Sequence, residues 1–207
     1  MRQNLRWALN VFERARAYTV SADLLAEVEW QRSRTPLEFT EADLLRETSW
    51  VILCCGFREA TVRRAFDHIS LSFCDWESAA SIVTAASACR ASALASINNP
   101  RKIDAIIDTA RVVEIKGFEE LKEQIIRQPL LELQRFPFIG PVTSCHLAKN
   151  LGFQIAKPDR HLVRLCQAVG FSDPQLLCSS IAETVGEAVN VVDLILWRYA
   201  ADGFSFL

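Results

Sequence analysis

Helical periodicity runs through almost the whole chain and constrains its fold more than any other feature. Apolar residues recur at intervals of three and four in segments such as 62–69 and 103–110, which is the spacing of one buried face of a helix. No segment alternates between apolar and polar residues for long enough to predict a strand. We therefore predict an all-α protein of about nine to eleven helices.

Residues at the ends of these segments support the same interpretation. Thr40 followed by Asp43 resembles a capping box, and Asn99-Pro100 pairs a cap residue with a first-turn proline. Asp75 precedes an Ala-rich segment and is expected to cap the helix there. These signals predict where three of the helices begin.

Length and composition are those of an ordinary globular protein, with 207 residues, of which 50% are hydrophobic and 23% charged. We predict a single domain over 1–207. One lobe is expected at about 25–125, and the other is expected to consist of about 126–207 plus the N-terminal helix, with a cleft between the lobes. Charged residues near the N-terminus argue against a secretion signal, and Arg90 within 78–97 argues against a membrane span. We expect a cytoplasmic monomer that binds no membrane.

The seven cysteines show no metal-binding pattern. They include no Cys-x-x-Cys pair and no spacing typical of a zinc or iron–sulfur site. Reduced, mostly buried thiols are expected instead, because free cysteine packs like a small hydrophobic residue. The sequence therefore predicts no iron–sulfur cluster.

Charge is distributed unevenly along the chain. The net charge of −2 is low for a nucleic-acid-binding protein, since such domains usually carry a basic excess. Within 133–166, however, Asp159 is the single acidic residue, and five residues are basic: Arg135, Lys149, Lys157, Arg160 and Arg164. A local basic face is therefore plausible on a mildly acidic protein.

The same stretch contains a turn rich in proline and glycine, followed by an aspartate that precedes a helix. A helix beginning at Pro141 leaves its first backbone amides without partners inside the helix, and Gly140 has no side chain to block them. Free amides at the positive end of a helix dipole suit a phosphate oxygen. A plain corner between two helices, which proline and glycine also form, is the alternative.

The segment LQRFPFIGPVTSC at 133–145 resembles the helix-hairpin-helix motif of the DNA glycosylase superfamily named for that hairpin, a Gly/Pro-rich loop and an aspartate. The hairpin residues that carry the resemblance are Leu133, Phe136, Pro137, Ile139, Gly140 and Thr143. The following KPDRHLVR segment supplies Asp159, His161 and Arg164 in register. Upstream, NPRKIDAIIDTARVV is similar to the segment that precedes the hairpin in this superfamily. The likeness covers about 98–170.

This resemblance implies a two-lobed, all-helical glycosylase fold with an interlobe cleft. It also implies a DNA glycosylase that extrudes a modified or damaged base from double-stranded DNA and hydrolyses its N-glycosidic bond, leaving an abasic site. The substrate is expected to be a damaged base, as in base-excision repair, or a hypermodified phage base, in which case the role is defence. A non-catalytic DNA-binding module and a bifunctional glycosylase/lyase are the alternatives.

The resemblance assigns Asp159 the catalytic role. Cleavage of an N-glycosidic bond builds positive charge on the sugar, and a fixed carboxylate beside C1′ stabilises that charge more than the ground state. Asp159 would also orient or deprotonate the attacking water. A simple helix cap, worth about 1 kcal/mol, is the alternative interpretation of this residue.

Two residues depart from the superfamily pattern within the hairpin. Phe138 replaces the first hairpin glycine, which would stiffen the loop or place a ring against DNA. Val142 occupies the place where bifunctional members carry a catalytic lysine, so no Schiff base can form from there. A monofunctional enzyme is therefore predicted, with Lys149, expected to be solvated, as the alternative amine.

The resemblance also implies which residues contact DNA, a cation and the base. The expected DNA-binding residues are Phe138, Ile139, Gly140, Val142, Thr143, Lys157, Arg160 and His161. A monovalent Na⁺ or K⁺ ion, with no organic cofactor, is expected on the backbone carbonyls of Gln134, Phe136 and Ile139. The base pocket is expected to use Trp50, Phe57 and Arg58, with Trp30 as a further candidate. Trp197 is expected to lie in the core.

Overall fold

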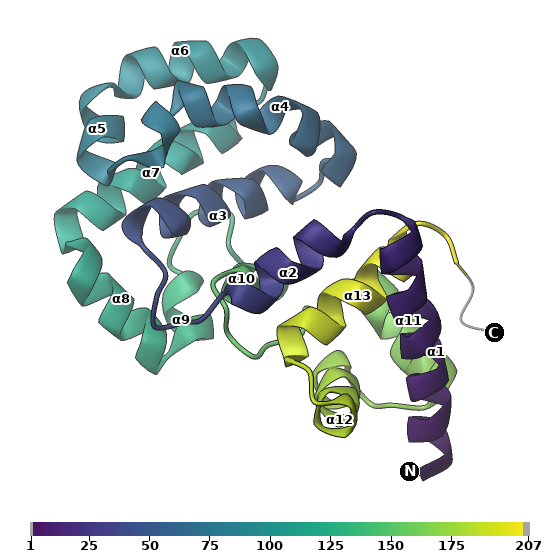
Figure 1. The fold of residues 1–207 in the computed structure, drawn as a ribbon. Coiled ribbons are helices and arrows are strands. Elements are labelled where there is room, and N and C mark those ends of the chain that lie inside the picture. The colour runs from purple at the N-terminus through teal and green to yellow at the C-terminus, as the bar shows by residue number, and fades with distance from the viewer. Residues whose placement is uncertain (1, 205–207) are drawn as a thin grey trace. The chain divides into compact units, whose positions relative to one another are not determined.

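The computed structural model describes residues 2–204 of the chain. Within these residues it contains thirteen α-helices, one short 3-10 helix and no strand (Figure 1), which confirms the all-α prediction. The helices outnumber the nine to eleven expected, in part because the Ala-rich segment divides at Ala85 into two helices.

The elements follow one another in this order: α1 (Arg2–Ser21), α2 (Leu25–Ser33), α3 (Glu41–Cys54), α4 (Glu59–Ser72), the 3-10 helix η1 (Cys74–Trp76), α5 (Ala79–Thr84), α6 (Ala86–Ser96), α7 (Pro100–Lys116), α8 (Phe118–Arg127), α9 (Pro129–Leu133), α10 (Pro141–Asn150), α11 (Arg160–Val169), α12 (Pro174–Val185) and α13 (Val189–Ala201). None of the helices over 2–204 is long and apolar enough to cross a membrane.

Contacts divide the chain into two compact units. Unit 1 is formed by residues 2–35 and 152–204, and unit 2 by Pro36–Leu151. Unit 2 thus extends past residue 125 to Leu151, and it includes the hairpin helices α9 and α10. There α9 packs against α8, and α10 packs against α9 and α3.

Unit 1 joins helices from both ends of the chain. Figure 1 shows α1 beside α13, and α1 also packs against α11 and α12, whereas α2 packs against α13. The core of this unit is made of apolar side chains from all five of these helices, among them Phe12, Val28, Leu165, Ile181 and Leu196. Arg198 of α13 holds Glu27 of α2 through two hydrogen bonds of 2.6 Å.

Unit 2 is built around α3, which packs against α4, α7, α10 and η1. The predicted capping box begins α3, since the Asp43 amide donates to Thr40 Oγ1 at 3.1 Å and the Thr40 amide donates to Asp43 Oδ2 at 2.9 Å. At the start of α7, Asn99 Oδ1 accepts the Lys102 amide at 3.3 Å. Both helix starts are therefore confirmed.

The segment between α4 and α5 differs from expectation. Cys74, Asp75 and Trp76 all adopt left-handed backbone conformations, with φ of 56°, 49° and 64°. Asp75 therefore does not cap α5, whose N-cap is Ser78. Each left-handed residue costs about 1–2 kcal/mol. Trp76 offsets part of that cost, because its ring is buried and stacks on Phe73 at 5.3 Å between centroids.

Candidate active site and nucleic-acid interface

The hairpin lies in unit 2, where residues 134–140 connect α9 to α10. Two consecutive turns shape the connection, because the Phe136 amide donates to the Leu133 carbonyl and the Ile139 amide to the Phe136 carbonyl, both at 3.2 Å. Phe136 and Ile139 are buried and anchor the turn from inside. The apolar residues of the motif therefore fix the shape of the hairpin, and its polar backbone stays at the surface.

Thr143 closes the hairpin from its C-terminal side. Its Oγ1 accepts the Gly140 amide at 2.6 Å and lies 3.2 Å from the Gly140 carbonyl oxygen. Pro141 has no amide hydrogen, and the helical ladder starts when the Ser144 amide donates to the Gly140 carbonyl at 2.8 Å. The amides of Val142 and Thr143 therefore have no acceptor within α10, as at any helix start.

Phe138 adopts a left-handed conformation with φ of 63°. Glycine reaches this region without strain, which explains why the superfamily pattern places a glycine here, whereas phenylalanine pays about 1–2 kcal/mol. The ring of Phe138 is 40% exposed, and its centroid lies 5.5 Å from the Nζ atom of Lys102. Phe138 therefore adopts the left-handed backbone conformation that favours glycine, and it adds an exposed aromatic ring.

Asp159 lies in unit 1 as the N-cap of α11. Its Oδ1 accepts the His161 amide at 2.9 Å and the Leu162 amide at 3.2 Å. Its Oδ2 lies 3.7 Å from the Nζ atom of Lys157, and the side chain is 14% exposed. One oxygen thus caps the helix and the other faces a cation, so a cap and a chemical role are compatible in this residue.

The backbone before Asp159 is held by buried polar groups. The Lys157 amide donates to Asp193 Oδ2 at 2.7 Å, and Asp193, on α13, is only 1% exposed. The Asp159 amide donates to the Lys157 carbonyl at 2.8 Å, which forms a tight turn around Pro158. Gln175 Oε1 accepts the Ala156 amide at 2.8 Å. These bonds fix the carboxylate in one place, as catalysis by a positioned group requires.

Asp193 was not recognised from the sequence as a site residue. Its signal was an acidic side chain at a buried position within the apolar segment 189–201. Trp197, expected in the core, is instead half-buried and lies edge-on to His161, with 6.4 Å between ring centroids. The structure thus places His161 beside an aromatic residue, whereas Arg160 and Arg164 are exposed.

The expected base-pocket residues fall into different surroundings. Trp50 packs edge-on against Phe66 at 5.0 Å between centroids, so it takes part in the packing of α3 on α4. Phe57 lies 5.1 Å from Lys102 Nζ, the same ammonium that contacts Phe138. Arg58 is exposed at the start of α4. Of the three, Phe57 is the one that shares a contact with the hairpin, and the pocket itself stays a prediction.

Lys149 differs from expectation, because α10 buries it to 5% exposure. Val142 is 42% exposed and carries no amine. Over residues 2–204 no group of three or more His, Cys, Asp and Glu side chains could hold a metal ion.

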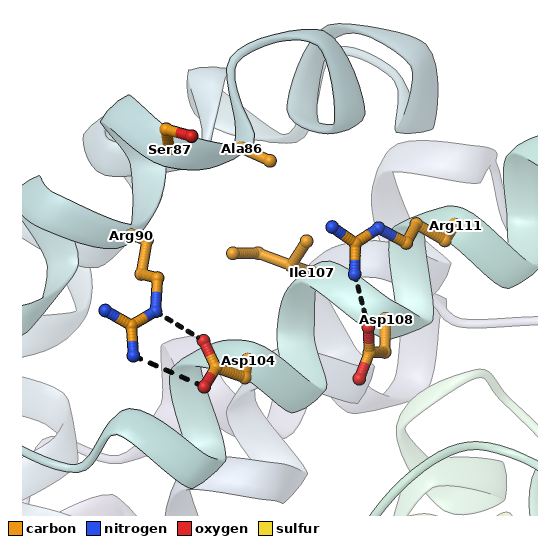
Figure 2. A pocket seen from close by; sticks show the side chains of 7 residues that line it. All are labelled: Ala86, Ser87, Arg90, Asp104, Ile107, Asp108 and Arg111. Carbon is orange, nitrogen blue, oxygen red and sulfur yellow. Dashed lines mark hydrogen bonds and ion pairs between the residues drawn. The ribbon is translucent and has the colours of Figure 1, made fainter.

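A cavity of about 260 Å³ lies elsewhere in unit 2, between α6 and α7. Figure 2 shows its charged walls, where Arg90 Nε pairs with Asp104 Oδ1 at 2.6 Å and Arg111 Nη1 with Asp108 Oδ1 at 2.7 Å. Ala86, Ser87 and Ile107 complete the lining. Within each ion pair the arginine and aspartate charges compensate each other, and none of the predicted site residues lines the cavity.

Comparison with known proteins shows a likeness among solved structures. No protein-family model matches the chain, and no curated protein matches it. Among solved structures, the chain is similar to the crystal structure of the 8-oxoguanine DNA glycosylase of Thermotoga maritima, with a TM-score of 0.63 and 21% sequence identity. The match covers 95% of this chain and 98% of that one. The all-α glycosylase fold predicted from the sequence is therefore confirmed.

Proposed function

We propose that this protein is a monofunctional DNA glycosylase, which hydrolyses the N-glycosidic bond of a modified base in double-stranded DNA. The observation that carries the proposal is Asp159, a largely buried carboxylate held by backbone amides and followed by a helix. The hairpin, with two amides that have no acceptor within α10, and the fold shared with a known DNA glycosylase support the same function.

The proposed chemistry uses Asp159 in two ways. As the bond between C1′ and the base nitrogen breaks, the electron pair leaves with the base, and the sugar gains positive charge that the carboxylate stabilises. Water then forms the new bond to C1′ and gives its proton to the oxygen of Asp159 that does not cap α11. The departing base takes up a proton from solvent and Asp159 releases its proton to solvent, so the products are a free base and an abasic site and the carboxylate is regenerated.

The amines around the site favour hydrolysis over a lyase reaction. Lys157 Nζ lies 3.7 Å from Asp159 Oδ2 and is engaged in an ion pair with that carboxylate. Val142 offers no amine in the hairpin, and Lys149 is buried. Borohydride should therefore trap no covalent complex with DNA, and a trapped complex would favour the bifunctional alternative.

The hairpin is proposed to bind the DNA backbone. The amides of Val142 and Thr143 would bind phosphate oxygens, and Ile139 and Gly140 would shape the turn around them. Lys157, Arg160 and His161 would add contacts from unit 1. The carbonyl oxygens of Gln134, Phe136 and Ile139 suit a Na⁺ or K⁺ ion, because alkali cations take neutral oxygen ligands, and the ion would stiffen the turn.

The deciding experiment incubates the protein with duplexes that each carry one damaged base, and with DNA from phages with hypermodified bases, followed by alkali to cleave abasic sites. A duplex with 8-oxoguanine is the first substrate to test, given the fold that the chain shares. Strand cleavage after alkali on one of these DNAs supports the proposal. Binding to an abasic duplex without base release from any of them would instead favour a non-catalytic DNA-binding module.

A further inference from the structure

A buried lysine joins three segments of unit 2. Lys102, in the first turn of α7, is 5% exposed. Its Nζ donates to the carbonyl of Ile52, to that of Leu53 at 3.2 Å and to that of Cys55 at 2.5 Å. These carbonyls lie at the C-terminus of α3, where a helix leaves its last carbonyls without amide partners. Lys102 thus caps α3 from another helix.

The same ammonium lies between two aromatic rings. Its Nζ is 5.1 Å from the ring centroid of Phe57 and 5.5 Å from that of Phe138, both within the range of a cation–π interaction. Burial lowers the pKa of Lys102, while Cys55 and Cys54 act in the opposite direction. Against the effect of burial, the carbonyl dipoles and the two ring faces stabilise the positive charge of Lys102.

The Lys102 contact acts on Phe138 together with Thr143, whose Oγ1 lies 3.4 Å from the Phe138 carbonyl oxygen. A phenylalanine with φ of 63° is strained, and its ring is 40% exposed, so local backbone preference does not hold it there. The Lys102 contact is an attraction that favours the observed ring position. Phe138 comes two residues before Gly140 and four before Val142, so its backbone helps to set the direction of the hairpin amides.

We propose that Lys102 is a positioning residue for DNA binding, which holds the Phe138 ring so that the hairpin amides stay oriented toward a DNA phosphate. This inference rests on the proposed function, because it assumes that the hairpin binds DNA. It adds a residue outside the hairpin, about thirty-six positions upstream of Phe138, on which DNA affinity depends. The chemical step at Asp159 does not involve Lys102.

The chain contains a matched control for this arrangement. Lys122 of α8 also lies between two rings, 5.2 Å from the centroid of Phe39 and 5.6 Å from that of Phe118. It belongs to the same unit and has no contact with the hairpin among those the structure describes. Lys122→Met therefore removes a similar cation–π pair without disturbing Phe138.

The experiment is a double-mutant cycle on affinity for a duplex with a stable abasic analogue, measured for Lys102→Met, Phe138→Leu and the double variant. Lys102→Met and Phe138→Leu should each weaken binding about tenfold, and the double variant should bind no worse than the weaker single variant, because both changes release the same contact. Lys122→Met should stay within about twofold of wild type. The excision rate of Lys102→Met at saturating enzyme should change less than about twofold, because Lys102 acts on affinity and not on the chemical step.

Two further variants protect the test against loss of folding. Lys102→Arg keeps a cation near both rings and should recover most of the affinity. Phe138→Gly reaches the left-handed conformation without a ring, so it should bind more tightly than Phe138→Leu and should lose little when Lys102→Met is added. Three outcomes would overturn the inference. The affinity losses of the two single variants could multiply in the double variant, or Lys122→Met could lose as much affinity as Lys102→Met. Phe138→Gly could also bind the duplex more weakly than Phe138→Leu. Failure of the wild-type protein to bind any duplex would instead refute the proposed function.

Discussion

Replacement of Asp159 separates its two roles. Asparagine keeps an oxygen that can cap α11, because Asp and Asn are similar N-cap residues, whereas alanine loses the bonds to the His161 and Leu162 amides. Asp159→Asn should therefore change stability by only a few tenths of a kcal/mol. Asp159→Ala should cost about 1 kcal/mol, or about 2–4 °C in Tm for a chain of this size.

The effect on rate should be far larger than the effect on stability. Loss of a cap worth about 1 kcal/mol changes the folding equilibrium constant by a factor of about five. Loss of a positioned acid–base and electrostatic group lowers a reaction rate by a factor of about 10²–10⁴. Asp159→Asn should reduce excision in that second range while affinity for an abasic duplex stays close to wild type. The excision rate is measured in single-turnover reactions by alkaline cleavage of the product, and the affinity for the abasic duplex is measured by a binding titration.

Asp173 provides the control, because it caps α12 in the same unit through the Leu176 amide at 2.9 Å. Asp173→Asn should leave the excision rate within about twofold of wild type. The assignment of Asp159 is refuted if Asp159→Asn excises bases at the wild-type rate, or if Asp173→Asn slows excision as much.

Three further predictions follow from contacts within single units. Lys157→Met removes the cation 3.7 Å from Asp159 Oδ2. It should weaken DNA binding and reduce the salt dependence of binding, and it should not change borohydride trapping. An unchanged salt slope in binding titrations contradicts a phosphate contact of Lys157. Phe138→Ala should be about 1 kcal/mol less stable than Phe138→Gly in urea unfolding, because both lose the ring and only alanine is strained at φ of 63°; equal stability argues against the left-handed conformation. Burial raises the pKa of Glu187, but hydrogen bonds from Arg32 and the Ala188 amide outweigh it, so the pKa lies below its usual 4.5. The contribution of the Glu187 carboxylate to folding stability is therefore present above its usual pKa and is lost as the pH falls through the lower folded-state pKa. Glu187→Gln should cost about 0.5–1 kcal/mol of stability at neutral pH and less in acid, given the partial exposure of Arg32. A stability cost that grows in acid contradicts the ion pair.

Local signals in the sequence predicted the parts of the fold that depend on neighbouring residues. The Thr40 and Asp43 pair, the Asn99 cap and the hairpin residues Phe136 and Ile139 act within a few positions of one another, so their roles are readable without knowing the tertiary fold. Asp75 was misassigned because the left-handed turn depends on the burial of Trp76 against residues of α4, which no local pattern shows.

In the candidate site too, the sequence predicted the residue whose signals are local and did not predict the residues that act at a distance. Asp159 was found because a cap and a motif coincide on it. Asp193 and Lys102 were missed, because each acts through backbone groups distant in sequence, the Lys157 amide in one case and the end of α3 in the other. Buried charges in apolar helices are the signal that could have directed attention to both.

The composition of unit 1 has a consequence for the order in which the protein folds during synthesis. Its α1 and α2 must wait for α11 to α13, whereas unit 2 is a continuous segment whose partners have all left the ribosome once Leu151 has emerged. Until α11 to α13 have emerged, the apolar faces of α1 and α2 lack their native partners. Nascent chains arrested after α10 should therefore protect unit 2 from a protease while residues 2–35 are still cut.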